Sequence, residues 1–164
     1  MVAQTGFDIK HKRQFLRYLG NCRNVTMHHY TDKIDSIESR ILPLVRAFDS
    51  KLTTPIYSCE GHWDKKTSPY VSFVVLPDME YTFFCWLSEI LESTPEDHVF
   101  YKIVHRHRPR RYKHGPGPFI EWYIMIDVPF PSIKNSQEFV SFLDMIIPKY
   151  SKFFADRFAN FHIF

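Results

Sequence analysis

The sequence has few cysteines, and nothing in their spacing joins them. Cys22, Cys59 and Cys85 are an odd number at wide spacing, and the 164 residues contain no C-x-x-C pair. This pattern argues against a disulfide framework and against a zinc ribbon, and it favours a reducing compartment. We therefore expect a cytoplasmic protein.

Long apolar runs are also missing. The N-terminal stretch Met1–Lys12 has no apolar segment of the kind found in signal peptides. The longest apolar runs, such as Phe73–Pro77, are far shorter than the ~20 residues that cross a bilayer. The sequence therefore predicts no membrane span and no standard export signal. A protein delivered into another cell by a contact-dependent machine is compatible with the same pattern.

Acidic residues are absent between Asp97 and Glu121, although the net charge of the whole chain is only +3. Within this interval, the stretch from residue 102 to residue 114 contains Lys102, His105, Arg106, His107, Arg108, Arg110, Arg111, Lys113 and His114. Their summed charge predicts a strongly positive local potential. Arginine binds phosphate in bidentate fashion and stacks on bases, so the segment predicts a phosphate-bearing partner: a nucleotide, a nucleic acid or a phospholipid head group. The alternative is a charged sheet edge that prevents aggregation.

What the sequence does contain is typical of one globular domain spanning residues 1–164. Apolar residues make up 45% of the chain and aromatic residues 17%, with 16 Phe and 9 Tyr. A chain of this length buries roughly two-thirds of its unfolded surface in one core. We expect that core to be built mainly from aromatic rings.

Hydrophobic periodicity divides the chain into helices and strands. We expect helices at residues 8–19, 31–48, 81–91 and 136–147 and after Pro148, and strands at residues 54–57, 70–76, 99–107 and 119–128. Pro43 and Pro148 are expected to kink or end the helices in which they lie. The order, two helices followed by two strand-strand-helix units and a last helix, predicts an α+β fold. Its sheet should be antiparallel or mixed, with about four strands and with helices packed mainly on one face.

The segment Ser58-Cys59-Glu60-Gly61-His62 concentrates reactive side chains in five residues. Gly61 permits a tight or left-handed turn, which could bring the Cys59 thiol to the His62 imidazole. A neighbouring imidazolium can lower a thiol pKa and create a nucleophile. We therefore expect Cys59, Glu60 and His62 to be catalytic, and Ser58 and Gly61 to contact a ligand. The alternative is structural: a buried thiol, a glycine turn, and two side chains that cap the backbone.

A metal site is a further alternative. Zinc accepts sulfur and nitrogen ligands, and Cys59 and His62 could join His105 and His107, which share one face of an extended strand. Glu60 would then serve as an acid or base in a zinc-dependent hydrolase or deaminase. However, no H-x-E or H-E-x-x-H spacing occurs. The sequence therefore favours a site without metal.

Two groups of known proteins resemble the segment from Lys33-Ile34-Asp35 through Ser58-Cys59-Glu60-Gly61-His62 to the strand at 70–75. It resembles a loose group of bacterial and phage proteins of unassigned function that carry a Ser-Cys-Glu-Gly-His loop before a strand. More distantly, it resembles the wybutosine-synthesis tRNA methyltransferase family, in which a Lys-Ile-Asp helix leads to a Thr-Ser-Ser-Cys-Ser-Gly-Arg loop. Ser58, Cys59 and Gly61 match that loop, whereas Glu60 and His62 depart from it. Membership would imply methyl transfer from S-adenosylmethionine to a tRNA base.

Together these features predict a small α+β protein in which the cysteine loop and the basic segment line one cleft. The cleft would bind a phosphate-bearing ligand through Ser58, Gly61, His105, Arg106, His107, Arg108, Arg110 and Arg111. A module without enzymatic activity, which docks nucleic acid or an acidic protein on the same basic face, is the alternative. Neither the reaction nor the oligomeric state is defined by the sequence.

Overall fold

A computed structural model describes residues 37–76, 79–92, 99–106 and 119–161. The elements follow one another as α3 (Leu42–Ala47), β1 (Thr53–Cys59), β2 (Tyr70–Val75), α4 (Glu80–Glu92), β3 (Val99–Arg106), β4 (Phe119–Ile126), the 3-10 turn η2 (Phe130–Ser132) and α5 (Ser136–Ala159). This order confirms the two predicted strand-strand-helix units. The helix predicted over residues 8–19 lies outside the described residues.

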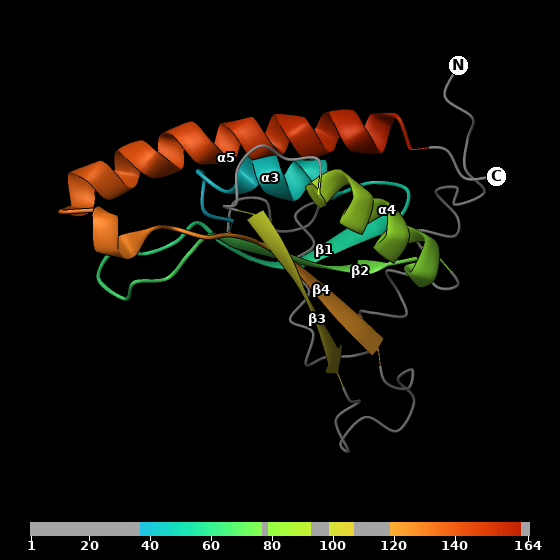
Figure 1. Ribbon diagram of the computed structural model, residues 1–164. Coiled ribbons are helices and arrows are strands. Elements are labelled where there is room, and N and C mark those ends of the chain that lie inside the picture. Colours follow the sequence, from blue (N-terminus) through green and yellow to red (C-terminus); the bar gives the residue numbers. More distant parts are fainter. Residues whose placement is uncertain (1–36, 77–78, 93–98, 107–118, 162–164) are drawn as a thin grey trace.

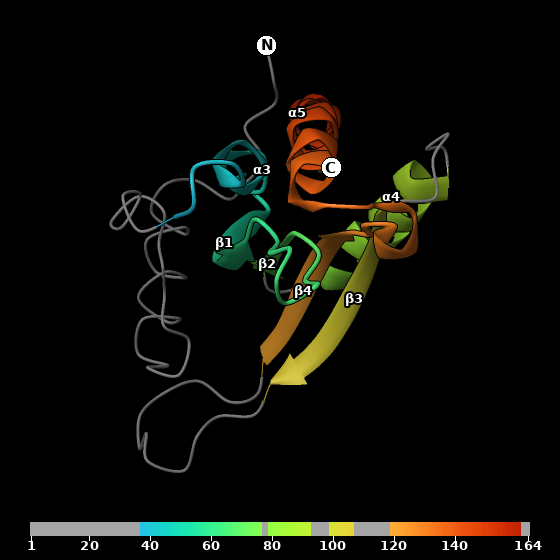
Figure 2. The same cartoon turned by 90° about the vertical axis from the view of Figure 1, so that its left-hand side faces the viewer.

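The four strands form one sheet in the order β1-β2-β4-β3, and every pairing is antiparallel. The predicted α+β class is therefore confirmed. A shift in register between Pro55 and Tyr57 introduces a bulge into β1. Figure 1 shows α3, α4 and α5 on the same side of the sheet, with the long α5 lying across α3. The view in Figure 2, nearly along α5, shows the sheet below these helices.

The core lies between the sheet and the helices, and aromatic rings fill much of it, as the composition predicts. The Phe48 ring from the end of α3 lies 4.6 Å from the Phe73 ring of β2, between ring centroids. The Phe83 ring of α4 lies 5.2 Å from the Trp122 ring of β4. All four side chains are at most 2% exposed. Because rings of this size bury 150–250 Å² each, they dominate the stabilisation of the sheet against the helices.

Pro43 begins a helix in the structure rather than kinking one. The predicted helix over residues 31–48 appears, within the described residues, only as the six-residue α3, with Pro43 in its first turn. Proline suits that position because its fixed φ matches the helix and its missing N–H would have no partner in the first turn. The apolar positions Ile41, Leu44 and Phe48 still pack in the core. The periodicity was therefore informative about burial although the helix is shorter.

Pro148 does not separate two helices, in contrast to the prediction. The helix α5 runs unbroken from Ser136 to Ala159 with Pro148 inside it. Apolar side chains on both sides of the proline pack on the same core, which compensates for the lost backbone hydrogen bond. Asn135, rather than Ser136, caps the helix, because its side chain accepts a hydrogen bond from the Glu138 N–H at 2.9 Å.

Candidate metal centre

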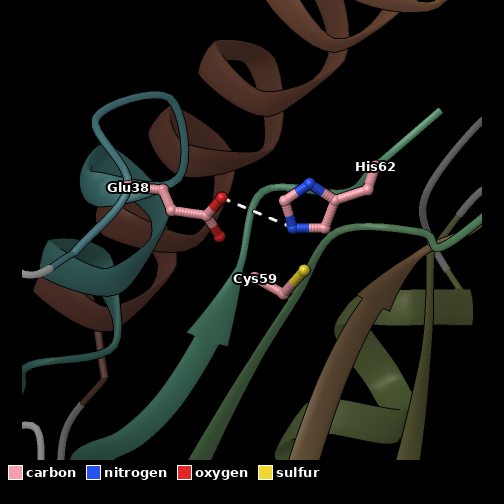
Figure 3. Close-up of side chains that lie close together, drawn as sticks. All are labelled: Glu38, Cys59 and His62. Carbon is pink, nitrogen blue, oxygen red and sulfur yellow. Dashed lines mark ion pairs between the residues drawn. The ribbon is translucent and has the colours of Figure 1, made fainter. Parts of the chain in front are cut away.

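Three side chains from different segments meet at the end of β1. Glu38 precedes α3, Cys59 is the last residue of β1, and His62 follows three positions later. One ligand atom from each lies within 4.8 Å of the other two. Figure 3 shows the carboxylate, the thiol and the imidazole pointing toward a common space. All three side chains are partly exposed, so the space is accessible from solvent.

A tight turn brings His62 back toward Cys59. Gly61 adopts φ +90°, a left-handed conformation that favours glycine. His62 then pairs with Thr67 in an isolated antiparallel bridge, and the His62 N–H also lies 2.9 Å from Thr67 Oγ1. The Gly61 N–H donates to Cys59 Sγ at 3.4 Å. The sequence Cys-Glu-Gly-His therefore folds so that its first and last side chains converge.

Aromatic contacts hold the loop after His62 against the start of α5. The Trp63 ring lies 5.8 Å from the Phe139 ring and 6.2 Å from the Phe130 ring, between centroids. The Lys66 ammonium stands 2.8 Å above the Trp63 ring, a cation–π contact. These contacts make Trp63 an anchor for the loop that carries His62.

The Glu60 N–H holds Glu38, while the Glu60 carboxylate binds Arg40. The Glu60 N–H donates to Glu38 Oε1 at 3.1 Å, which leaves Oε2 of Glu38 directed toward His62. The Glu60 carboxylate accepts from the Arg40 N–H at 3.1 Å and from the Arg40 guanidinium at 3.4 Å. Arg40 in turn donates to Asp144 of α5 at 2.8 Å, and this hydrogen bond raises the pKa of Arg40. The carboxylate beside the thiol is therefore Glu38, not the expected Glu60.

The orientation of the imidazole distinguishes two kinds of site. Nε2 of His62 lies 3.5 Å from Oε2 of Glu38. In Figure 3 the same nitrogen is the one nearer the Cys59 sulfur, while the other nitrogen points away from both partners. A Cys-His-Glu relay would need one nitrogen toward the thiol and the other toward the carboxylate. A metal ion needs one lone pair from each ligand at one point, which is the arrangement present.

The surroundings of Cys59 disfavour its charged form in the absence of a metal. Burial raises the pKa of the Cys59 thiol, and the negative charges of Glu38 and Glu60 raise it further. Hydrogen bonds from the Gly61 N–H and the Thr67 side chain act in the opposite direction and are outweighed. This direction is the reverse of the lowered pKa that activates a free cysteine nucleophile.

Tyr70 of β2 lies opposite Cys59 in the sheet. It is paired with Cys59 across the antiparallel ladder, so the two side chains lie on the same face of the sheet. Its ring packs 5.6 Å from the Tyr123 ring of β4. Burial raises the pKa of the Tyr70 hydroxyl, and Cys59, Glu121 and Glu38 raise it further. Tyr70 is a site residue that the sequence analysis did not identify.

The remaining residues of the cysteine segment have other surroundings. Ser58 is paired with Val71, which is fully buried in the core, so its side chain lies on the opposite face of β1 from Cys59. Gly61 forms the turn, and a Cβ built there would lie 3.0 Å from the Thr67 carbonyl oxygen.

The start of the basic segment lies at the opposite corner of the sheet from Cys59. Along one row of the ladder Cys59 pairs with Tyr70, Tyr70 with Met125, and Met125 with Phe100. Arg106 is six positions beyond Phe100 on β3, which corresponds to about 20 Å along the strand, and two strands, β2 and β4, lie between β1 and β3. His105 and Arg106 therefore do not line one cleft with Cys59. Whether they bind a ligand of their own stays a prediction, and His107, Arg108, Arg110 and Arg111 lie outside the described residues.

The set of side chains that could hold a metal ion therefore differs from the predicted set. His105 shares the position of Arg106 at the far corner and does not join Cys59 and His62. Within the described residues, Glu38 is the third possible metal ligand beside Cys59 and His62. The sequence analysis missed Glu38 because it lies in the segment 31–48, which was expected to be a helix. Its only signal is its place just before a buried apolar run, where many unrelated acids occur.

No protein-family model, no curated protein and no solved structure matches this chain. The resemblance to the wybutosine-synthesis family, and the use of S-adenosylmethionine that it would imply, therefore stay predictions. Among the described helices, none is long and apolar enough to cross a membrane.

Proposed function

We propose that this protein binds a zinc ion through Glu38, Cys59 and His62 and uses it for hydrolysis. The observation that carries the proposal is the convergence of a carboxylate oxygen, a thiol sulfur and an imidazole nitrogen within 4.8 Å. These are the three donor types that zinc prefers. Three protein ligands with a fourth position open to solvent are typical of catalytic rather than structural zinc sites.

The distances suit a small closure onto an ion. Tetrahedral zinc with bonds of 2.0–2.3 Å places its ligand atoms roughly 3.5 Å apart. The Glu38–His62 pair is already at 3.5 Å. Bringing all three atoms from within 4.8 Å to that spacing needs movements of about 1 Å, which side-chain rotation can provide.

The groups behind the ligands support the same role. Oxygen ligands of metal sites are commonly held by hydrogen bonds from outer groups, which fix their orientation. Here the Glu60 N–H holds Oε1 of Glu38, and the Gly61 N–H donates to the Cys59 sulfur. A cytoplasmic location, where thiols stay reduced, suits a cysteine ligand.

Zinc titration of the metal-free protein tests the proposal. We expect one equivalent to bind, and cobalt in its place should give a sulfur-to-metal charge-transfer band. Cys59→Ser should abolish that band and weaken zinc binding. The matched control is Cys85→Ser, because Cys85 is an exposed thiol on α4 that contacts none of the three ligands in the described structure. Less than about a tenth of an equivalent of bound zinc, or equal binding by both variants, would contradict the proposal.

Hydrolysis is tested separately with p-nitrophenyl acetate as the probe ester. The zinc-loaded protein should cleave it faster than buffer containing the same zinc concentration. Removal of the metal with a chelator should abolish the excess rate, and added zinc should restore it. Tight zinc binding with no excess rate toward this ester or a panel of esters and amides would indicate a structural site instead.

A further inference from the structure

The charges around Glu38, Cys59 and His62 restrict the substrates that this site can accept. The charged groups that act on Cys59 and Tyr70 are the carboxylates of Glu38, Glu60 and Glu121. Arg40, which binds Glu60, is also bound to Asp144 on its other side. A thiolate and a carboxylate neutralise a bound zinc ion. The described part of the site therefore lacks the positive charge that a phosphate ester needs.

Tyr70 adds a hydrogen-bond donor on the face of the sheet that carries Cys59. The Cys59–Tyr70 pairing places their Cβ atoms about 5 Å apart on the same face of the sheet. Cys59 and Glu38 both act electrostatically on the Tyr70 hydroxyl and raise its pKa. Packing of its ring against Tyr123 fixes its direction.

From these two features we propose that the site hydrolyses an uncharged acyl group, an ester or amide, and that Tyr70 donates a hydrogen bond to the acyl oxygen. This inference rests on the proposed zinc site. A donor aimed at an oxygen that gains charge in the transition state is the usual means of lowering the barrier of acyl transfer. Tyr70 is then a catalytic residue, because its hydroxyl touches the reacting carbonyl.

The chemical step is an ordinary hydrolysis. The oxygen of water forms a bond to the acyl carbon, and the π electrons of the carbonyl move onto its oxygen, which accepts the hydrogen bond from Tyr70. When this intermediate collapses, the bond from carbon to the leaving oxygen or nitrogen breaks. The leaving group takes up the proton that the attacking water has lost. Tyr70 keeps its own proton throughout, and no oxidant or reductant takes part.

Acetohydroxamate is the probe, because it is a small acyl compound whose oxygens bind zinc. Its affinity for the zinc-loaded protein is measured by calorimetry for the natural sequence, Tyr70→Phe and Tyr123→Phe, with inorganic phosphate as the competing anion. We expect Tyr70→Phe to bind acetohydroxamate about 10-fold more weakly, the effect of one lost hydrogen bond to a charged oxygen. Zinc affinity should be unchanged in that variant. Tyr123→Phe, which removes a neighbouring hydroxyl, should bind both zinc and acetohydroxamate normally.

The outcomes separate the two proposals. If the natural sequence does not hold zinc, the zinc site itself is wrong. If it holds zinc and Tyr70→Phe binds acetohydroxamate as tightly as the natural sequence, the role of Tyr70 is wrong. If phosphate binds more tightly than acetohydroxamate, the substrate class is wrong. Should Tyr70→Phe lose zinc as well, the test passes to Tyr70→Leu, which has no hydrogen-bond donor, and equal acetohydroxamate binding by a zinc-loaded Tyr70→Leu overturns the role of Tyr70.

Discussion

Nε2 of His62 lies 3.5 Å from Oε2 of Glu38, so a residue before α3 meets a residue after β1. The connection between them runs through Glu60, whose N–H holds the other oxygen of the same carboxylate. The geometry of the site therefore depends on backbone contacts as well as on its three side chains. Each of these contacts can be tested by one substitution.

Replacement of Glu38 by glutamine should weaken zinc binding while the fold is retained. The amide has nearly the same shape but no negative charge, and it is a poor zinc ligand. We expect the zinc dissociation constant to rise by more than about 10-fold, since even the loss of an outer hydrogen-bond partner costs 10–100-fold. Competition against a chromogenic chelator measures this change. Glu89→Gln on the exposed face of α4 is the matched control and should bind zinc normally. Equal affinities for the two variants would remove Glu38 from the site.

Replacement of Gly61 by alanine should destabilise the fold. At φ +90° an alanine is strained, and its Cβ would lie 3.0 Å from the Thr67 oxygen, 3.2 Å from Pro69 Cδ and 3.3 Å from Phe139 Cζ. We expect the free energy of unfolding to fall by about 1–3 kcal/mol, measured by urea denaturation. Lys65→Ala in the same loop is the control, because Lys65 is exposed. A change below about 0.5 kcal/mol for Gly61→Ala, the size of an ordinary surface effect, would show that this turn is not constrained.

The sequence was sufficient to predict the strands of the sheet, but not to predict which residues of different strands lie close together. Runs of β-branched and aromatic residues identify β2 and β4, because these residue types favour strands. Strand order is different: it depends on which edges pair, and no local pattern encodes that. The sequence analysis therefore predicted that Cys59 and Arg106 line one cleft, whereas the strand order β1-β2-β4-β3 places them on opposite edges of the sheet.

Two further differences have local causes. A proline is ambiguous in a periodic pattern, since it is favoured in the first turn of a helix and disfavoured in the interior. Pro43 takes the first role, and Pro148 is tolerated in the second because the surrounding core contacts outweigh its cost. Glu38 could not be singled out, because a lone acid gains meaning only when the fold places it against Cys59 and His62.

The thiol of Cys59 should react slowly at neutral pH in the metal-free protein. Burial and the charge of Glu38 raise its pKa, so the reactive thiolate forms only at higher pH than the ~8.5 usual for cysteine. The alkylation rate with iodoacetamide, measured against pH in a Cys22→Ser, Cys85→Ser background, should reach half its maximum above that value. In Glu38→Gln the half-point should move down, because one of the charges that raise the pKa is gone. A half-point at or below ~8.5 in the parent would contradict the described surroundings.

The same shift predicts how stability depends on pH. A thiol whose pKa is higher in the folded state binds its proton more tightly there, so its stabilising contribution is complete below the unfolded pKa of ~8.5. It is lost as the pH rises through the folded pKa. Urea denaturation should therefore show a larger decline in stability above pH ~8.5 for the parent than for Cys59→Ala. Parallel pH profiles would argue against a raised pKa.

Replacement of Pro148 by alanine should stabilise α5. Proline has no N–H, so the carbonyl of Asp144, four residues earlier, receives no helical hydrogen bond from position 148. Alanine supplies that donor, and Pro148 is exposed, so no core contact is lost. We expect a gain of about 1–3 kcal/mol in the free energy of unfolding, since an interior proline costs roughly 3 kcal/mol and core packing has already relieved part of that cost.

The control for this substitution is Lys152→Ala, which changes an exposed position of the same helix. It should alter stability by no more than about 0.5 kcal/mol. Because Asp144 also binds Arg40, which holds Glu60, the new hydrogen bond to the Asp144 carbonyl is linked to the ion pairs behind the site. The zinc affinity of Pro148→Ala therefore tests a separate question, which is whether the proline also affects the proposed zinc site. Higher stability with weaker zinc binding would show that the proline places Asp144 for the site, whereas higher stability with unchanged zinc binding would confine its effect to the helix. A loss of stability would contradict the prediction and indicate that the rest of the core is shaped around the proline.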